Sequence, residues 1–222
     1  MKYTKNLIMM SAIIGLLISC QSEDNDSNGV ELLFSINEDI VNYRSPGDLQ
    51  FTDGFITIIE VEFSADKAGG GSVNKEKSGM VVYDFMSGQS TPTSNTIHIP
   101  AGDYKDVYLG IELYDENDKP SLAIEGTYEK QLDGKVYPLR FEFNSGEVFE
   151  AEAESATVPT DSPAIAKIKF DPHEWFASVS FDELESAKVN GQGVIVISES
   201  SNEDIFDLVA DGLDLSTEAV FQ

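Results

Sequence analysis

The segment Asp171–Phe176 holds the most unusual combination of side chains in the chain. It contains the sole tryptophan, Trp175, one of the two histidines, His173, and the carboxylate Glu174. If exposed, Trp175 would offer an aromatic platform for a sugar ring, while His173 and Glu174 would donate and accept hydrogen bonds. A lone tryptophan is more often a core residue, and Pro172 would then stiffen the bend. We favour the core interpretation and keep His173, Glu174 and Trp175 as candidate ligand-binding residues.

A second candidate surface lies on one predicted strand. Tyr104, Tyr108 and Tyr114 are separated by even numbers of residues, so strict alternation places them on one face with Asp106 and Glu112. An exposed face would be an amphipathic platform for a glycan or a partner protein. A half-buried face would use the rings for cross-strand packing, and we favour that interpretation.

The run Asp115-Glu116-Asn117-Asp118 carries oxygen ligands of the kind that a hard cation such as Ca²⁺ prefers. It lacks the glycine and the distal glutamate of an EF-hand loop. A solvated hairpin turn is the better interpretation. We therefore predict no metal site and keep Asp115, Asn117 and Asp118 as weak candidates.

Side chains for catalysis are few in this sequence. His98 and His173 are not part of an HExxH-type pattern, and no nucleophile elbow is present. With 40 acidic residues, a glycosidase-type carboxylate pair cannot be recognised from spacing. We predict no catalytic residues and no cofactor, and we expect that the protein is not an enzyme.

The surroundings of Cys20, the sole cysteine, predict lipid attachment. Lys2 and Lys5 precede the apolar run Leu7–Ile18, and the combination is typical of a secretory signal peptide. The run is too short to span ~30 Å of hydrocarbon comfortably. The sequence Leu17-Ile18-Ser19-Cys20 resembles the lipobox of bacterial lipoproteins. The resemblance implies cleavage before Cys20, a diacylglycerol thioether on its sulfur and an acylated N-terminus. The alternative is an ordinary signal peptide with an incidental cysteine.

The residues after Cys20 are polar and acidic, so Gln21–Gly29 is expected to be a flexible tether. Glutamine rather than aspartate after the cysteine implies outer-membrane sorting by enterobacterial rules. A serine followed by acidic residues is also similar to the export signal of Bacteroidota lipoproteins. These resemblances imply a lipid-anchored protein of the outer membrane, displayed on the cell surface.

The net charge of the mature chain limits the classes of partner that it can bind. Removal of residues 1–19 leaves 222 − 19 = 203 residues, with 14 − 2 = 12 basic and 40 acidic side chains, hence a net charge of 12 − 40 = −28. Such a charge repels nucleic acid and anionic lipid. We expect the charge to serve solubility at a crowded surface. The expected partners are a membrane, through acylated Cys20, and a glycan or surface protein.

Short apolar and alternating stretches dominate the rest of the chain. Residues 65–79, with three consecutive glycines, are expected to be a loop, and residues 104–158 an antiparallel meander. Short helices are expected over 182–188 and 203–209, the second ending at Gly212. The predicted strands cover residues 30–36, 55–63, 80–86, 96–99, 104–114, 122–131, 136–143, 148–158, 165–170 and 194–197.

This pattern predicts an all-β fold, mainly an antiparallel β-sandwich with Greek-key or meander connections and two short C-terminal helices. The expected organisation is a signal peptide over 1–19, a lipidated tether over 20–29 and a single domain over 30–222. A domain break near residues 158–163 is the alternative.

The stretch Ile99–Tyr104, Ile-Pro-Ala-Gly-Asp-Tyr before an alternating strand, resembles uncharacterised β-sandwich domains of Bacteroidota lipoproteins. The resemblance implies a fold and no particular reaction. The leading hypothesis is a non-enzymatic, surface-anchored binding or accessory lipoprotein. The alternatives are a structural subunit of a surface or fimbria-like assembly and, third, a glycan-acting enzyme.

Overall fold

The computed structural model describes residues 29–36, 49–93, 96–115, 119–146, 148–213 and 218–221. Strands make up 57% of the structure and helices 13%. The sheets are largely antiparallel and the helices are short and C-terminal, which confirms the predicted fold class. The predicted signal peptide, Cys20 and most of the tether lie outside the described residues, as do Asn117 and Asp118.

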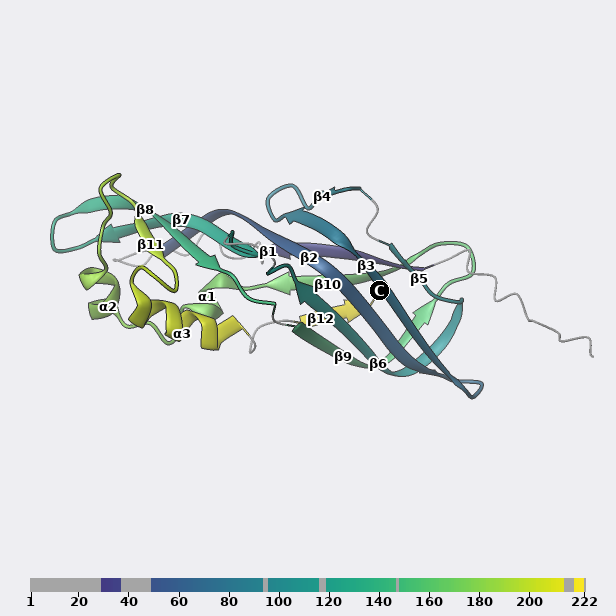
Figure 1. Ribbon diagram of the computed structural model, residues 1–222. Helices are drawn as coiled ribbons and strands as arrows, with labels where there is room; N and C mark the ends of the chain where they lie inside the picture. Colours follow the sequence, from purple (N-terminus) through teal and green to yellow (C-terminus); the bar gives the residue numbers. More distant parts are fainter. Residues whose placement is uncertain are drawn as a thin grey trace, which may run out of the picture.

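The smaller of two sheets has four strands (Figure 1). At its centre β1 and β10 run parallel, with Val30 opposite Ala164 and Ile36 opposite Phe170. The sheet consists of β12 (Glu218–Phe221), β10 (Ala164–Phe170), β1 (Gly29–Ile36) and β5 (Thr96–His98), in that order.

The larger sheet has eight strands. Its path runs β11 (Ile195–Ile197), β8 (Lys135–Phe143), β7 (Leu122–Lys130), β2 (Leu49–Lys67), β3 (Ser72–Asp84) and β4 (Ser90–Thr91), with β6 (Gly102–Leu113) beside β2 and β9 (Val148–Val158) beside β6.

The long strand β2 organises the larger sheet because it has two successive partners along one edge. Residues 49–56 pair with β7 and residues 58–67 pair with β6, while β3 occupies the opposite edge. Thr57 lies at the changeover: its N–H donates to Ser121 at 2.6 Å, and its carbonyl accepts from the N–H of Tyr114 at 3.1 Å. The predicted meander over residues 104–158 is therefore wrong in detail, because β6 and β7 lie end to end along β2 and do not pair.

β-Bulges change which side chains point inward. One irregularity lies between Ile58 and Glu60 of β2. Another lies at Asp106 of β6, whose φ of 49° is left-handed. Because an extra residue inverts the alternation that follows it, Tyr104 points into the core with Val107, and not outward with Tyr108. The prediction of one face for Tyr104, Tyr108 and Tyr114 is therefore wrong.

Tyr104 closes the corner between β5 of the smaller sheet and β6 of the larger one. Its ring is 1% exposed, and its hydroxyl donates to the carbonyl of Pro100, four residues earlier. This contact has the geometry of a tyrosine corner, which fixes the crossing of the chain from one sheet of a sandwich to the other.

The loop predicted over residues 65–79 is mostly strand. β2 continues to Lys67 and β3 begins at Ser72. Only the intervening residues turn, with Gly70 at φ 96° and Gly71 at φ 86°. These conformations need glycine, whereas the flanking polar residues are compatible with an exposed hairpin.

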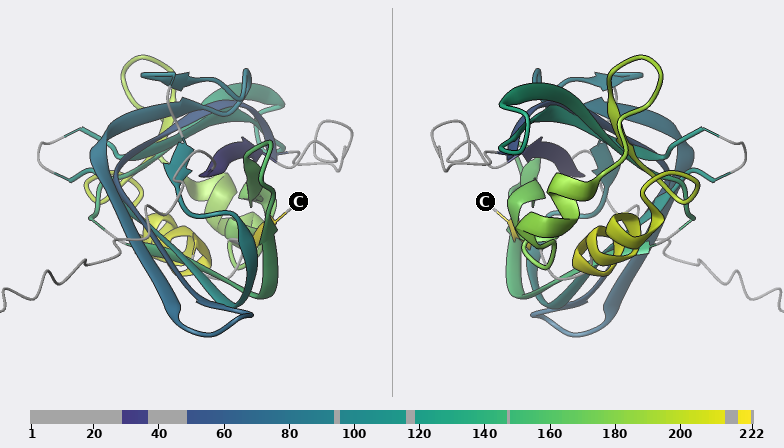
Figure 2. Two further views of the ribbon diagram at one scale, coloured as in Figure 1. Left: turned by 90° about the vertical axis from the view of Figure 1, so that its right-hand side faces the viewer. Right: turned by 90° about the vertical axis from the view of Figure 1, so that its left-hand side faces the viewer.

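Three helices gather at the end of the molecule where β7, β8 and β11 lie (Figures 1 and 2). They are α1 (Pro172–Trp175), α2 (Phe181–Ser186) and α3 (Glu203–Leu213). Helix α2 begins earlier than predicted because Ser180 is the N-cap and forms a capping box with Glu183. Helix α3 continues through Gly212, the predicted end, since that residue packs against the backbone of Trp175.

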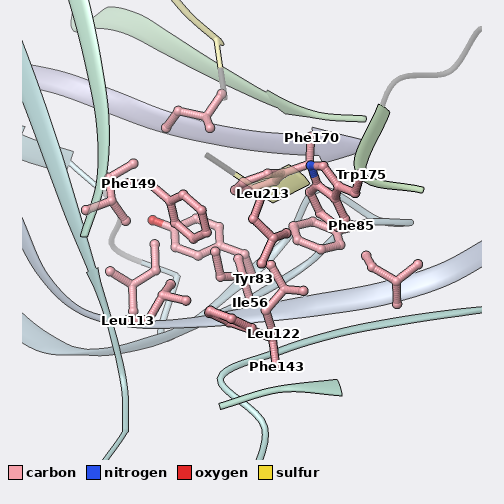
Figure 3. Close-up of a cluster of buried hydrophobic side chains, with 14 of the residues drawn as sticks. Ile56, Tyr83, Phe85, Leu113, Leu122, Phe143, Phe149, Phe170, Trp175 and Leu213 are labelled. Atoms are coloured by element: carbon pink, nitrogen blue, oxygen red, sulfur yellow. The ribbon is translucent and has the colours of Figure 1, made fainter. Parts of the chain in front are cut away.

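The buried side chains of both sheets and of the helices form one connected core. Figure 3 shows part of this core. Phe170 of β10 packs against Trp175 of α1 and against Phe85, which follows the end of β3. The ring centroids of Phe170 and Trp175 are 5.7 Å apart, and those of Phe85 and Phe170 are 5.4 Å apart. No helix among the described residues is long and apolar enough to cross a membrane.

Candidate functional site

The sequence-predicted segment around Trp175 is part of the core. Trp175 is 0% exposed, so its ring is not available as a sugar platform. His173 is half-buried and its ring lies edge-on to Phe51 at 5.1 Å. Glu174 is exposed, and its backbone N–H, like that of His173, is held by the Asp171 carboxylate that caps α1. The three residues therefore form one helical turn and do not converge on a common ligand position.

The three predicted tyrosines lie in three different environments. Tyr104 is in the core, as described above. Tyr108 is half-buried on the outer face, where its hydroxyl donates to Glu150 at 3.0 Å. Burial, followed by this bond and the nearby carboxylates, raises the pKa of Tyr108. Tyr114 is half-buried beside the β2 changeover, and it alone of the three lines the pocket described next.

A pocket of about 620 Å³ opens on the outer face of the larger sheet, at the point where β2 changes partner. Its volume lies in the range of about 300–1,000 Å³ that is usual for small-molecule sites. The strands β2 and β3 supply Phe55, Thr57, Met80 and Val82. Their register explains this set, because Thr57 lies opposite Val82 and the core-facing pair Ile56 and Tyr83 comes next.

The remaining walls come from the segment that joins β6 to β7 and from β8. β6 ends at Leu113 and β7 begins at Leu122, and described residues next to these two ends lie beside the pocket. Tyr114, Lys119 and Pro120 line the pocket from this segment, and Arg140 lines it from β8. The pocket thus lies at the point along β2 where its partner changes from β7 to β6.

Arg140 is held in place by two carboxylates. Its Nε donates to Glu142 at 2.5 Å, and one terminal nitrogen donates to Glu125 on β7. Glu125 lies directly opposite Arg140 in the β7–β8 pairing. The two bonds use two of the five N–H donors of a guanidinium group, and they fix the plane of the group at the edge of the pocket.

A second depression, of about 520 Å³, lies farther along the outer face, between β6 and β9. Its lining includes Asp106, Glu152 and Glu154 together with Tyr108. Among the described residues no group of three or more histidine, cysteine or acidic side chains could hold a metal ion. The two hollows therefore differ in chemistry, one being acidic and the other apolar with basic side chains.

The weak metal candidate Asp115 is exposed, and its carboxylate lies against Gly146. A β-carbon added at Gly146 would lie 2.7 Å from Oδ2 of Asp115. Its proposed partners Asn117 and Asp118 lie outside the described residues.

Most lining residues of the outer pocket were not singled out by the sequence. Phe55, Val82 and Arg140 lie on three separate strands, and only a correct register brings them together. The one signal for the pocket in the sequence is an apolar residue on the outward side of a strand, as at Phe55 and Met80. Alternation alone does not distinguish such a residue from one that packs in the core.

Comparisons with known proteins give no family for this chain. No family model matches it, and neither the curated proteins nor the solved structures contain a match. The chemistry of its sites is therefore argued from its own residues.

Proposed function

We propose that this chain is a non-enzymatic lipoprotein, anchored to the outer membrane through Cys20 and exposed at the cell surface, that binds a glycan or a partner protein in the outer-sheet pocket. The observation that carries the binding role is the lining of the pocket. Phe55 and Tyr114 provide aromatic surface, and Thr57, Lys119 and Arg140 provide hydrogen-bond donors. This mixture of apolar surface with a few convergent polar groups is characteristic of ligand sites.

The anchoring role rests on the sequence of the first 29 residues. The lipobox-like segment Leu17–Cys20 follows an apolar run, and a polar tether separates it from the first strand at Gly29. Several acyl chains on one N-terminus hold a protein firmly to a membrane, whereas a single chain binds only marginally.

Of the two ligand classes, the pocket favours a glycan. A pyranose ring has an apolar C–H face and a polar rim, which match aromatic rings flanked by hydroxyl and cationic donors. A partner protein would be expected to cover about 800 Å² on each side of a standard interface, far more than this pocket alone offers.

The test compares four forms of the full-length protein in bacterial membranes: wild type, Phe55→Ala, Phe181→Ala and Cys20→Ala. Each is solubilised in mild detergent and applied to a glycan array. Phe181 is an exposed phenylalanine on α2 and serves as the matched control. We expect wild type and Phe181→Ala to bind the same glycans and Phe55→Ala to bind none of them. The melting temperature of Phe55→Ala is compared with that of the wild type to show that the variant is folded.

Cys20→Ala should retain glycan binding but lose lipid labelling and firm membrane attachment. Failure of the wild type to retain any glycan, or unchanged binding by Phe55→Ala, would contradict the proposed binding role. Incorporation of labelled fatty acid by Cys20→Ala would contradict the proposed anchor.

A further inference from the structure

We infer that the turn over residues 190–194, between α2 and β11, modifies itself covalently: Asn190 loses its side-chain amide as ammonia and becomes aspartate or isoaspartate. The co-reactant is water, and no enzyme is required. The inference is carried by two backbone N–H groups that hold the side-chain oxygen of Asn190 where negative charge develops during the reaction. It concerns a part of the chain that the proposed function does not use.

The turn that carries Asn190 is closed by its own backbone. The N–H of Asn190 donates to the carbonyl of Val194 at 2.9 Å, and the N–H of Gly193 donates to the carbonyl of Asn190 at 3.0 Å. Val189 and Ile195 form an antiparallel bridge just outside these bonds. Ile195 is fully buried in β11, so the turn is tied to the core. The side chain of Asn190 therefore starts from a fixed backbone position.

The side chain of Asn190 folds back over this turn. Its Oδ1 accepts from the backbone N–H of Gln192 at 2.9 Å and from that of Val194 at 3.0 Å. Because both partners are donors, the accepting atom is the oxygen of the amide and not its nitrogen. An oxygen that reaches residues two and four positions ahead brings the amide carbon, Cγ, over the intervening backbone, which includes the nitrogen of Gly191.

Gly191 supplies the nucleophile, its backbone nitrogen, and leaves the attack unobstructed. Asn190 and Gly191 are both exposed, so water reaches the reacting atoms. No atom lies within 4 Å of the position that a β-carbon on Gly191 would take. The N–H of Gly191 donates to no acceptor among the described residues, so its proton can pass to hydroxide in the solvent.

The reaction balances without an oxidant or a reductant. The Gly191 nitrogen gives its proton to hydroxide and bonds to Cγ of Asn190, which puts the negative charge on Oδ1. The Cγ–Nδ2 bond then breaks, and Nδ2 takes a proton from water, leaves as ammonia and regenerates hydroxide. Water adds to the resulting succinimide ring. Opening at Cγ gives aspartate, and opening at the backbone carbonyl carbon of Asn190 gives isoaspartate.

The two donors to Oδ1 stabilise the intermediate of the first step. Oδ1 is neutral in the amide and negative once Cγ becomes tetrahedral, and hydrogen bonds to a charged oxygen are roughly twice as strong as neutral ones. Enzymes stabilise such intermediates with N–H groups at about 2.7–3.1 Å from the oxyanion. Here the donors belong to the backbone of Gln192 and Val194 and are already oriented. The folded turn should therefore react faster than the same sequence in an unfolded chain.

The experiment follows loss of the Asn190 amide in the full-length protein by peptide-mapping mass spectrometry. The protein is incubated at neutral pH in detergent micelles, once folded and once unfolded in urea. We expect the amide to be lost about tenfold faster in the folded protein, the ratio that one strengthened hydrogen bond provides. Asn28, the other asparagine followed by glycine, supplies an independent value for the rate of an unfolded Asn-Gly pair in urea.

Two substitutions at one exposed position separate the N–H of Gln192 from its side chain. Gln192→Pro removes a donor to Oδ1, whereas Gln192→Ala keeps this donor and shortens the same side chain. We expect Gln192→Pro to slow the reaction of the folded protein about tenfold and Gln192→Ala to leave it unchanged. Melting temperatures show whether both variants are folded, and if Gln192→Pro is not, the folded and unfolded wild type decide the question.

Two results would overturn the inference. The first is a rate in the folded wild type that is equal to the rate in urea or lower, since the hydrogen bonds to Oδ1 would then hold the amide away from attack. The second is an equal rate in folded Gln192→Pro and Gln192→Ala, which would show that the N–H of Gln192 does not stabilise the developing charge.

Discussion

Glu185 is a buried carboxylate that joins helix α2 to the β7–β8 hairpin. It is 6% exposed and accepts hydrogen bonds from the backbone N–H groups of Gln131 and Leu132, at 2.9 and 3.1 Å, and from the hydroxyl of Tyr128 at 2.9 Å. The ammonium group of Lys130 donates to the backbone carbonyl of Glu185 at 2.8 Å. Burial alone would raise the pKa of this carboxyl, but the hydrogen bonds and Lys130 hold it below its ordinary value of 4.5.

A depressed pKa in the folded state makes stability depend on pH. The folded carboxylate binds its proton less tightly than the unfolded one, so its contribution is fully present above about pH 4.5. The contribution is lost as the pH falls through the lower pKa of the folded state. We therefore predict that Glu185→Gln lowers the melting temperature by several degrees at pH 7, because the amide offers only one acceptor oxygen, and that the difference from wild type shrinks below pH 4.

Thermal unfolding followed by circular dichroism between pH 3 and pH 8 checks this prediction. Glu199→Gln is the control, since Glu199 is exposed on the turn after β11. It should leave the melting temperature nearly unchanged across the range. A deficit in Glu185→Gln that stays constant from pH 7 to pH 3 would show that the charge of Glu185 contributes nothing.

At the scale of elements, the contact of α1 with α3 depends on a glycine inside a helix. A β-carbon at Gly212 would lie 2.7 Å from the carbonyl oxygen and 2.9 Å from the α-carbon of Trp175. These are backbone atoms of α1 and cannot rotate away. Because Trp175 is anchored in the core, α3 would have to move to admit even one methyl group.

We predict that Gly212→Ala destabilises the protein by about 1–3 kcal/mol, the usual cost of overpacking. The sign is informative, since the same change in an exposed helix interior stabilises by roughly 0.5–1 kcal/mol. Urea unfolding measures the difference. Gly191→Ala is the control, because no atom lies within 4 Å of its added β-carbon and the change should be nearly neutral. A stabilised Gly212→Ala would mean that α1 and α3 do not touch at this point.

Elements could be predicted from the sequence more reliably than their partners. Alternation and turn residues located most strands, and residues 148–158 were predicted to the residue. Alternation fails where a bulge inserts a residue, as at Asp106, and the error then moves Tyr104 from the core to the surface. The sequence predicts a helix end at Gly212 because local propensity does not include a tertiary contact with Trp175.

The candidate pocket was beyond prediction for a related reason. Its lining comes from β2, β3, β8 and the β6–β7 connection, which are brought together by two successive pairings along one strand. The sequence predicts Tyr114 as a candidate binding residue, but its predicted companions Tyr104 and Tyr108 do not line the pocket. Sequence pattern fixes the period of each strand, whereas a site between strands depends on register.

Over the whole molecule, the register of the smaller sheet defines two opposite ends of the domain. Gly29 pairs with His98 at one end of β1, and Ile36 pairs with Phe170, next to α1, at the other. The β2–β3 hairpin lies at the end of Gly29, because the N–H of Ala68 donates to Asp103 close to the β5–β6 corner. The three helices and the β7–β8 hairpin occupy the opposite end of the elongated domain (Figure 1).

Anchoring through Cys20 would turn this direction into an orientation at the membrane. The path from Cys20 to Gly29 has nine residue-to-residue steps (29 − 20) and spans at most about 30 Å when fully extended. β2 alone has 19 residues, or about 60 Å of strand. The helix-bearing end should therefore point away from the lipid, and repulsion between the acidic domain and anionic headgroups should favour the same arrangement.

We predict that a fluorophore on Ser72→Cys, in the β2–β3 hairpin, is quenched by lipids labelled at the headgroup. A fluorophore on Leu132→Cys should be quenched far less, since Leu132 is 83% exposed at the tip of the β7–β8 hairpin. If Cys20 is acylated as proposed, its thiol is consumed, and each introduced cysteine can then be labelled selectively in the reconstituted protein. The control adds Cys20→Ala to the Ser72→Cys protein, which should abolish quenching by releasing the domain from the vesicles. Stronger quenching at position 132 than at position 72 would contradict the predicted orientation. The helix-bearing end would then face the membrane, and the outer-sheet pocket would bind its ligand in that orientation.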